Sequence, residues 1–310
     1  MARKRKCCAI IGGCRFPHSV TRYDFEKNDF TPLCDAPLKC YFSCVAVVKN
    51  YVYVVGGMHS ASQRSIQVFN VDNNTWAVHH DILKTPRTNA AVVAIRDMLY
   101  VIGGGDVRKE LSSIEVIAVD GEKCERVDDH NIPNLKQARC GHTAVKIDTI
   151  IYVIGGECHD QTLSSCERID TKTGEQTYIA ALNIARSSLA AVAHGNLIYA
   201  LGGCDQQSKS LSSVEVYSVE NNSWTITASM NFPRYDHCAI IHDDTIFAIA
   251  GVDVNYISPV NNIECCNINC KQPMWRIHRA TDVIGRYDSC AVLIETDFGS
   301  HDDEQETIGE

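Results

Sequence analysis

The stretch Ile150-Ile151-Tyr152-Val153-Ile154-Gly155-Gly156 is a short apolar run of β-forming residues that ends at two glycines. The chain repeats this run along most of its length. The plain copies are Tyr53-Val54-Val55-Gly56-Gly57, Tyr100-Val101-Ile102-Gly103-Gly104 and Tyr199-Ala200-Leu201-Gly202-Gly203. Degenerate copies are Ala9-Ile10-Ile11-Gly12-Gly13 and Phe247-Ala248-Ile249-Ala250-Gly251. The glycine pairs, or their remnant, begin at positions 12, 56, 103, 155, 202 and 250, so the sequence contains a long internal repeat.

Each repeat contains four segments with strand patterns. In the third repeat these are residues 90–95, 98–102, 114–119 and 124–127, and in the fifth they are residues 189–193, 197–201, 214–219 and 224–227. Asparagine-rich turns separate the last two segments at residues 72–75 and 220–223, where asparagine tolerates a left-handed backbone. Four strands in a repeat of about 40 to 50 residues are typical of a β-propeller with one blade per repeat.

The two ends of the chain predict how the ring closes. The first glycine pair comes at residue 12, too early for an inner strand to precede it, while residues 286–293 repeat the pattern of residues 234–241 with no second strand after them. We therefore expect an all-β, six-bladed propeller in which residues 285–295 complete the first blade and remove the open strand edges. The expected domain is residues 7–295, between a basic leader (1–6) and an acidic, disordered tail (296–310).

Composition limits the classes of function. The net charge is −9 and no basic face is visible, which argues against a nucleic-acid partner. No apolar run approaches the roughly 18 residues of a membrane helix, and residues 7–11 are too short for a secretory signal. The 16 cysteines fit an intracellular protein with reduced thiols. We expect a cytoplasmic protein without membrane contact or cofactor, and Arg3-Lys4-Arg5-Lys6, which resembles a nuclear signal, leaves a nuclear location open.

The order of motifs within a repeat resembles the kelch repeat. The motifs that carry the resemblance are Pro86-Arg87, the Tyr-x-x-Gly-Gly runs, Ser213-Val214-Glu215-Val216-Tyr217 and Asn222-Ser223-Trp224. The resemblance covers about residues 7–293. Six such repeats closed by a C-terminal strand are similar to the kelch half of the Kelch-like (BTB-kelch) family. This resemblance implies a protein-recognition module that captures a substrate for a cullin-3 ubiquitin ligase, or alternatively a kelch protein that binds or cross-links actin and associates with the cytoskeleton.

The chain departs from the family pattern in two ways. Only Trp76, Trp224 and Trp275 mark blades with the expected tryptophan; Phe30, Cys124 and Gln176 stand at that position in the others. Met1 lies six residues before the first predicted strand, which leaves no room for the BTB and BACK segments that would bind cullin-3. We therefore expect this chain to recognise a substrate without a visible means of recruiting the ligase.

Residues that recur in every blade are expected to build the blade. The glycine pairs allow backbone conformations and close approaches of strands that other residues do not. The alternative is a phosphate-binding loop, but no predicted helix and no lysine follow these glycines as such a loop requires. One recurring set is Arg87, Arg139, Arg186, Arg234 and Arg286, and the other is Glu115, Glu167, Glu215 and Glu264, with Gln67 in the second blade. We predict a charge-assisted structural contact between them; ligand binding by the arginines is the alternative. The tryptophans and Tyr217 are expected to pack between blades.

The cysteines and histidines do not predict catalytic chemistry. Cys265, Cys266, Cys270 and His278 have some resemblance to a zinc site, but neighbouring residues of a strand point to opposite faces, so we expect no metal there. Cys14 and Cys204 follow glycine pairs on loops, where redox sensing is the alternative to a structural role. No hydrolase or metalloprotease motif is present, so we expect no enzyme; a copper oxidase is an alternative by fold analogy alone.

Positions that vary between blades are expected to bind a partner. The loops after the glycine pairs and the starts of the inner strands should emerge on one end of the ring. The positions after the glycine pairs are Arg15, His59, Asp106, Arg108, His159, Asp205 and Asp253. The positions at the inner strands are Tyr41, Thr88, Cys140, Ser187, Tyr235 and Tyr287. Tyrosines in blades 2, 6 and 1 should form one aromatic arc that anchors a peptide; the alternative is that Tyr235 and Tyr287 line a water-filled channel.

Overall fold

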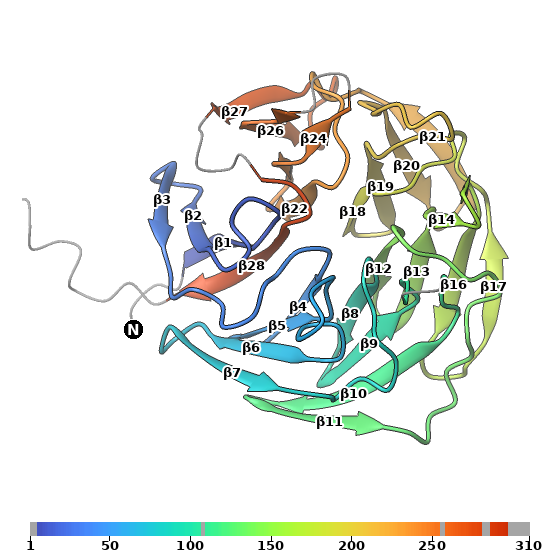
Figure 1. Cartoon of the computed structure of the whole chain (residues 1–310). Helices are drawn as coiled ribbons and strands as arrows, with labels where there is room; N and C mark the ends of the chain where they lie inside the picture. Colours follow the sequence, from blue (N-terminus) through green and yellow to red (C-terminus); the bar gives the residue numbers. More distant parts are fainter. Residues whose placement is uncertain (1–4, 107–108, 255–257, 281–285, 297–310) are drawn as a thin grey trace, which may run out of the picture.

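The structure is a computed structural model that describes residues 5–106, 109–254, 258–280 and 286–296. Within these ranges every regular element is a β-strand, and six four-stranded antiparallel sheets are arranged as blades around a ring (Figure 1). The predicted all-β, six-bladed propeller is confirmed. The described part of the chain contains no helix that could cross a membrane.

The first three blades have the following strands, from the innermost outward. Blade 1 consists of β28 (Cys290–Thr296), β1 (Arg5–Ile11), β2 (Val20–Asp24) and β3 (Asp29–Pro32). Blade 2 consists of β4 (Cys44–Val48), β5 (Tyr51–Val55), β6 (Ile66–Asn70) and β7 (Thr75–His79). Blade 3 consists of β8 (Ala91–Ile95), β9 (Met98–Ile102), β10 (Ile114–Asp120) and β11 (Lys123–Val127).

Two of the remaining blades carry an additional two-stranded ribbon. Blade 4 consists of β12 (Thr143–Ile147), β13 (Ile150–Ile154), β16 (Cys166–Asp170) and β17 (Gln176–Ile179), with the ribbon β14 (Glu157–Cys158) and β15 (Gln161–Thr162). Blade 5 consists of β18 (Ala190–His194), β19 (Leu197–Leu201), β20 (Val214–Ser218) and β21 (Ser223–Thr227). Blade 6 consists of β22 (Cys238–His242), β23 (Thr245–Ile249), β26 (Asn262–Asn267) and β27 (Arg276–Ala280), with the ribbon β24 (Val252–Asp253) and β25 (Ser258–Pro259).

The C-terminal strand closes the ring as predicted. β28 pairs antiparallel with β1 from Cys290 opposite Ile11 to Thr296 opposite Arg5, and the two strands lie side by side in Figure 1. The sheet is longer than the sequence indicated, because Arg5 and Lys6, assigned to the leader, pair with Thr296 and Glu295. Residues 297–310 of the predicted tail lie outside the described residues.

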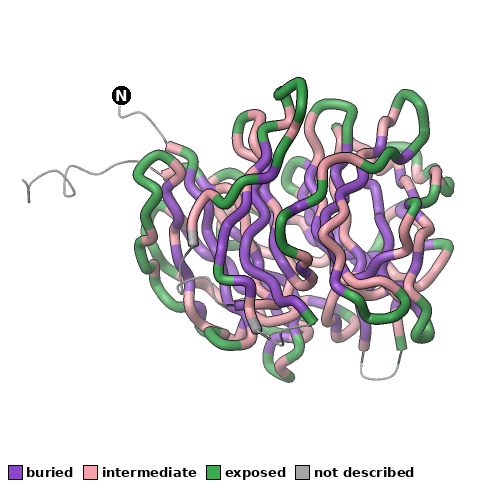
Figure 2. Tube along the Cα trace, turned by 90° about the horizontal axis from the view of Figure 1, so that it is seen from above, coloured by how far each residue is buried: buried purple, intermediate pink, exposed green. Residues whose placement is uncertain are grey.

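The apolar cores lie between neighbouring blades, and Figure 2 shows the buried strands between two ends of exposed loops. One core brings Tyr152 of blade 4 together with Tyr217 and Trp224 of blade 5. The indole of Trp224 donates a hydrogen bond to the carbonyl of Ala180 in the connection that leaves blade 4, at 2.9 Å. Trp76 and Trp275 make the same contact with the connections that precede their blades. The predicted packing of tryptophan between blades is confirmed.

The recurring arginine and glutamate form a buried ion pair inside each of four blades. The guanidinium of Arg139 donates to the carbonyl of Gly155 at 2.6 Å and to Glu167 Oε1 at 2.9 Å. Glu167 also accepts hydrogen bonds from the backbone N–H groups of Lys136 and Gln137. The equivalent pairs are Arg87–Glu115, Arg186–Glu215 and Arg234–Glu264. All four arginines are at most 1% exposed, so their predicted structural role is confirmed and they are not available to a ligand.

Blades 1 and 2 replace this ion pair by other contacts. In blade 2, Cys40 stands at the arginine position and Gln67 at the glutamate position, and Gln67 Nε2 donates to Cys40 Sγ at 3.2 Å. Gln67 Oε1 still accepts from the backbone N–H of Leu38, as a glutamate does in the other blades. In blade 1, Arg286 donates to the carbonyl of Gly12 and to Thr21 Oγ1, which stands at the glutamate position.

Candidate functional site

The two sets of variable positions meet on one end of the ring, which we call the recognition end. Backbone bridges join Thr88 to Gly105 in blade 3 and Cys140 to Glu157 in blade 4. The same bridge joins Ser187 to Cys204 in blade 5 and Tyr235 to Val252 in blade 6. The segment that leads into each of these inner strands is thereby attached to the loop that follows the glycine pair of the same blade.

The glycine pairs connect neighbouring blades at this end. The N–H of Gly156 in blade 4 donates to the carbonyl of Arg186 in blade 5 at 2.9 Å. The preceding residue, Gly155, has a φ of +61°, and a Cβ atom there would lie 2.5 Å from that carbonyl oxygen. A side chain at this position would therefore separate the two blades, which explains the repeated glycine.

Backbone hydrogen bonds connect successive blades around the mouth of the central channel. The second residue after each arginine position has a left-handed backbone, with φ between 49° and 57°. In blades 3, 4, 5, 6 and 1, its N–H donates a hydrogen bond of 2.7 to 3.1 Å to the carbonyl of the equivalent residue in the preceding blade. The series begins with Asn89, which donates to Phe42, and ends with Asp288, which donates to Asp236. The six residues of this mouth ring are Phe42, Asn89, Gly141, Ser188, Asp236 and Asp288. They help to line a cavity of about 110 Å³.

Two carboxyl groups of this ring lie against each other. Asp236 of blade 6 and Asp288 of blade 1 share a side-chain hydrogen bond, and the Cys14 thiol donates to Asp288 Oδ2 at 3.0 Å. Burial and the neighbouring charge of Asp236 raise the pKa of Asp288 to about 8, so the pair holds a proton at neutral pH. This pair was not predicted from the sequence, although the repeated Tyr235-Asp236 and Tyr287-Asp288 were a visible signal.

The histidines beside this ring carry no charge. Burial and the nearby cations of Arg139 and Arg87 lower the pKa of His142 to about 3, and burial lowers the pKa of His237 well below its ordinary value. Both imidazoles are buried, so they contribute volume and not charge to the mouth. The ionisable character of the mouth is therefore acidic.

The acidic character extends over blades 4 to 6. Burial, followed by the charges of Asp236, Asp205, Glu157 and Asp253, raises the pKa of the Cys204 thiol to about 12. Burial and its hydrogen bond with Asp288 likewise raise the pKa of Cys14 to about 12. Thiols with such pKa values are poor nucleophiles at neutral pH, which argues against redox sensing by either cysteine.

The predicted contact positions differ in exposure. The side chains of Arg15 and His159 are exposed, whereas Ser187 and Asp253 are 6% and 5% exposed and offer little surface to a partner. Arg108 lies outside the described residues. The half-buried positions are Tyr41, His59, Thr88, Asp106, Cys140, Asp205, Tyr235 and Tyr287. Their role in binding stays a prediction.

The zinc arrangement considered from the sequence does not assemble. Cys266 is buried in the core between blades 5 and 6, whereas Cys265 packs against the core between blades 6 and 1. Cys270 is an exposed turn residue beyond β26. The side chains of Cys265 and Cys266 thus point to opposite faces of β26, as expected for neighbouring residues of a β-strand.

Comparison with known proteins agrees with this architecture. The chain is 28% identical over 192 residues to Kelch repeat and BTB domain-containing protein 1 of Cowpox virus (strain Brighton Red), covering 61% of this chain and 33% of that protein. It is 26% identical over 189 residues to Kelch-like protein 26 of Danio rerio, covering 58% of this chain and 30% of that protein. The matches thus span about one third of the length of these curated relatives.

A solved structure shows the same fold. The structure of YjhT superimposes with a TM-score of 0.68 at 14% sequence identity, covering 80% of this chain and 86% of that chain. The model of the KLHDC2/KLHL20/DRC7 Kelch-repeats domain matches residues 36–251. A kelch propeller is typically a non-enzymatic module for protein–protein interaction. This chain belongs to the family of kelch-repeat domains.

Proposed function

We propose that the recognition end binds a peptide segment of a partner protein, and that the chain is the substrate-recognition part of a cullin-3 ubiquitin ligase. The observation that carries the first part is the half-buried set Tyr41, Tyr235 and Tyr287. They occupy equivalent positions in the consecutive blades 2, 6 and 1, around the acidic mouth. Half-buried tyrosines are rigid, amphipathic anchors of the kind that dominate binding energy in protein interfaces.

The acidic groups of this end favour a basic partner segment. Asp205 and Glu157 are half-buried beside the mouth, and their charges act on the same thiol of Cys204. A segment with lysine or arginine would meet complementary charge, which accelerates association and excludes acidic competitors. The link to a ligase is supported by relatives whose names combine kelch repeats with a BTB domain.

The test is a comparison of captured proteins. Wild-type protein and the triple variant Tyr41→Ala, Tyr235→Ala, Tyr287→Ala are used as bait in a cell lysate, and bound proteins are identified by mass spectrometry. Tyr178→Ala is the matched control, because Tyr178 is 53% exposed on the outermost strand of blade 4. We expect a discrete set of proteins to be lost from the triple variant and kept by the control. Equal capture by all three folded proteins would refute this binding site.

The captured set also tests the proposed pathway. Ligase substrates should be stabilised in cells by inhibition of cullin-3, and their association with the purified chain should slow as salt rises. Recovery of actin filaments without cullin-dependent turnover would instead indicate a cytoskeletal protein. Association that is insensitive to both salt and Asp205→Asn would contradict the basic segment.

A further inference from the structure

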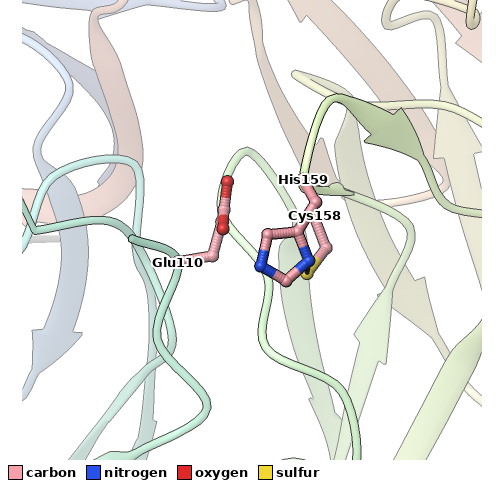
Figure 3. Close-up of side chains that lie close together, drawn as sticks. All are labelled: Glu110, Cys158 and His159. Atoms are coloured by element: carbon pink, nitrogen blue, oxygen red, sulfur yellow. Dashed lines mark hydrogen bonds between the residues drawn. The ribbon is translucent and has the colours of Figure 1, made fainter. Parts of the chain in front are cut away.

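Loops from two adjacent blades bring three metal-ligating side chains together on the recognition end. They are Glu110 of blade 3 and Cys158 and His159 of blade 4, and one ligand atom from each lies within 4.8 Å of the others. Figure 3 shows the carboxylate of Glu110 facing the imidazole of His159, with the sulfur of Cys158 beside the ring. In the described part of the chain this is the one such group of three or more His, Cys, Asp or Glu residues.

The backbone holds these side chains on hydrogen-bonded hairpins. Cys158 lies in β14, opposite Gln161 of β15, and His159 occupies the tight turn between them with a φ of 49°. Glu110 is bridged to Gly105, and the next residue, Leu111, donates its N–H to the carbonyl of Gly104 at 2.7 Å. The backbone positions of all three ligands are therefore fixed by hydrogen-bonded neighbours, while the side chains of Glu110 and His159 can adjust to an ion.

The chemistry of the set suits zinc. A thiolate, an imidazole and a carboxylate are the three ligand types that Zn²⁺ accepts, with bonds of about 2.0 to 2.3 Å in a tetrahedral arrangement. Two donors of such a tetrahedron are separated by roughly 3.3 to 3.8 Å, and Cys158 Sγ lies 3.4 Å from His159 Nδ1. Glu110 is half-buried and His159 exposed, so both have room to rotate onto an ion that enters from solvent.

We propose that Glu110, Cys158 and His159 bind a zinc ion that joins the loops of blades 3 and 4. On binding, the Cys158 thiol releases its proton to solvent and sulfur becomes a thiolate ligand. Three protein ligands leave the fourth tetrahedral position open to water or to a donor group of a bound partner. The proposal does not depend on the identity of that partner.

The ligands have no recognisable spacing in the sequence, which therefore predicted no metal. Cys158 and His159 are adjacent, and Glu110 belongs to the preceding repeat, so only the packing of the blades brings the set together. Cys140 lies close by. The pKa of its thiol is raised mainly by burial and by Glu157, and to a smaller extent by Glu110 and Cys158. It is outside the group of three and therefore provides a neighbouring control.

The experiment is a metal titration of reduced, chelator-treated protein. Zn²⁺ affinity is measured by competition with a chromophoric chelator, and Co²⁺ is used as a spectroscopic probe of thiolate ligation. The variants are Cys158→Ser, His159→Asn and Glu110→Gln; the controls are Cys140→Ser and Cys34→Ser, since Cys34 is an exposed thiol elsewhere. We expect about one zinc per wild-type chain and a loss of affinity of at least about tenfold in each ligand variant.

Two further readouts separate a site from adventitious binding. The cobalt–thiolate absorption should disappear in Cys158→Ser and persist in both controls. Zinc should raise the melting temperature of the wild type and of the controls, and not of the ligand variants. Zinc affinity that is equal in all six proteins, loss of the cobalt band in Cys34→Ser alone, or the absence of binding to folded wild type would overturn the proposal.

Discussion

At the scale of single residues, the repeat separates structural side chains from variable ones. Arg186 is fully buried and donates to Gly202, Ser213 and Glu215 within its own blade. Its recurrence at the same position in other blades was sufficient to predict this role. The exception in blade 2 was not predictable in the same way, because nothing in the local sequence indicates that Cys40 and Gln67 pair where an ion pair stands elsewhere.

The change Arg186→Ala tests the ion pair directly. It leaves Glu215 buried without its guanidinium partner, and breaking a buried pair in this way costs about 3 to 5 kcal/mol. We expect a clear fall in the melting temperature, measured by circular dichroism. Arg126→Ala is the matched control, because its pair with Asp128 is partly exposed at the surface, and it should lower the melting temperature far less. Equal melts for Arg186→Ala and wild type would contradict a structural role.

At the scale of strands, the sequence was most informative where the pattern is local. The apolar runs before the glycine pairs predicted β9, β13 and β19 to the residue, because each is buried on both faces and is bounded by glycine. The extension of β1 to Arg5 was not predictable, since basic residues at a terminus resemble a solvated leader. It results from pairing with Thr296, at the far end of the chain.

Truncation tests the closing strand. A chain that ends at Ser289 lacks β28, so β1 becomes an open strand edge. The apolar side chains that pack against the buried Cys290 and Ile294 also become exposed to solvent. We expect such a chain to aggregate or to melt far below the wild type, as judged by size-exclusion chromatography and thermal scanning. A chain that ends at Thr296 keeps all of β28 and should behave like the full chain. Normal folding without β28 would show that ring closure is dispensable.

At the scale of the whole molecule, ring closure creates groups that were not predictable from the repeat. Asp236 lies two residues before the inner strand β22 of blade 6 and Asp288 two residues before β28 of blade 1, while Cys14, which donates to Asp288, comes from the opposite end of the chain. The trio Glu110, Cys158 and His159 likewise requires two blades to pack. Comparison of the repeats identifies the residues that all copies share. These two groups are instead made of residues that differ between repeats, and they come together only when the blades pack in the closed ring.

The carboxyl pair therefore gives the folded ring its own dependence on pH. The pKa of Asp288 is about 8 in the folded chain and about 3.9 when unfolded, so between these values the folded state holds a proton that the unfolded state has released. The contribution of this pair to stability should consequently fall as pH rises through this window, by up to about 1.4 kcal/mol per pH unit. Below about pH 6.5, His142 and His237 oppose this trend, because they are neutral in the folded chain and gain protons when it unfolds; the fall is therefore expected between about pH 7 and 8. Asp288→Asn removes the shared proton, so its unfolding free energy, measured in urea between pH 7 and 8, should depend less on pH than that of the wild type. Asp205→Asn removes a carboxylate of the same end outside the pair and should keep the wild-type slope; equal slopes for Asp288→Asn and wild type would show that the two carboxyls do not share a proton.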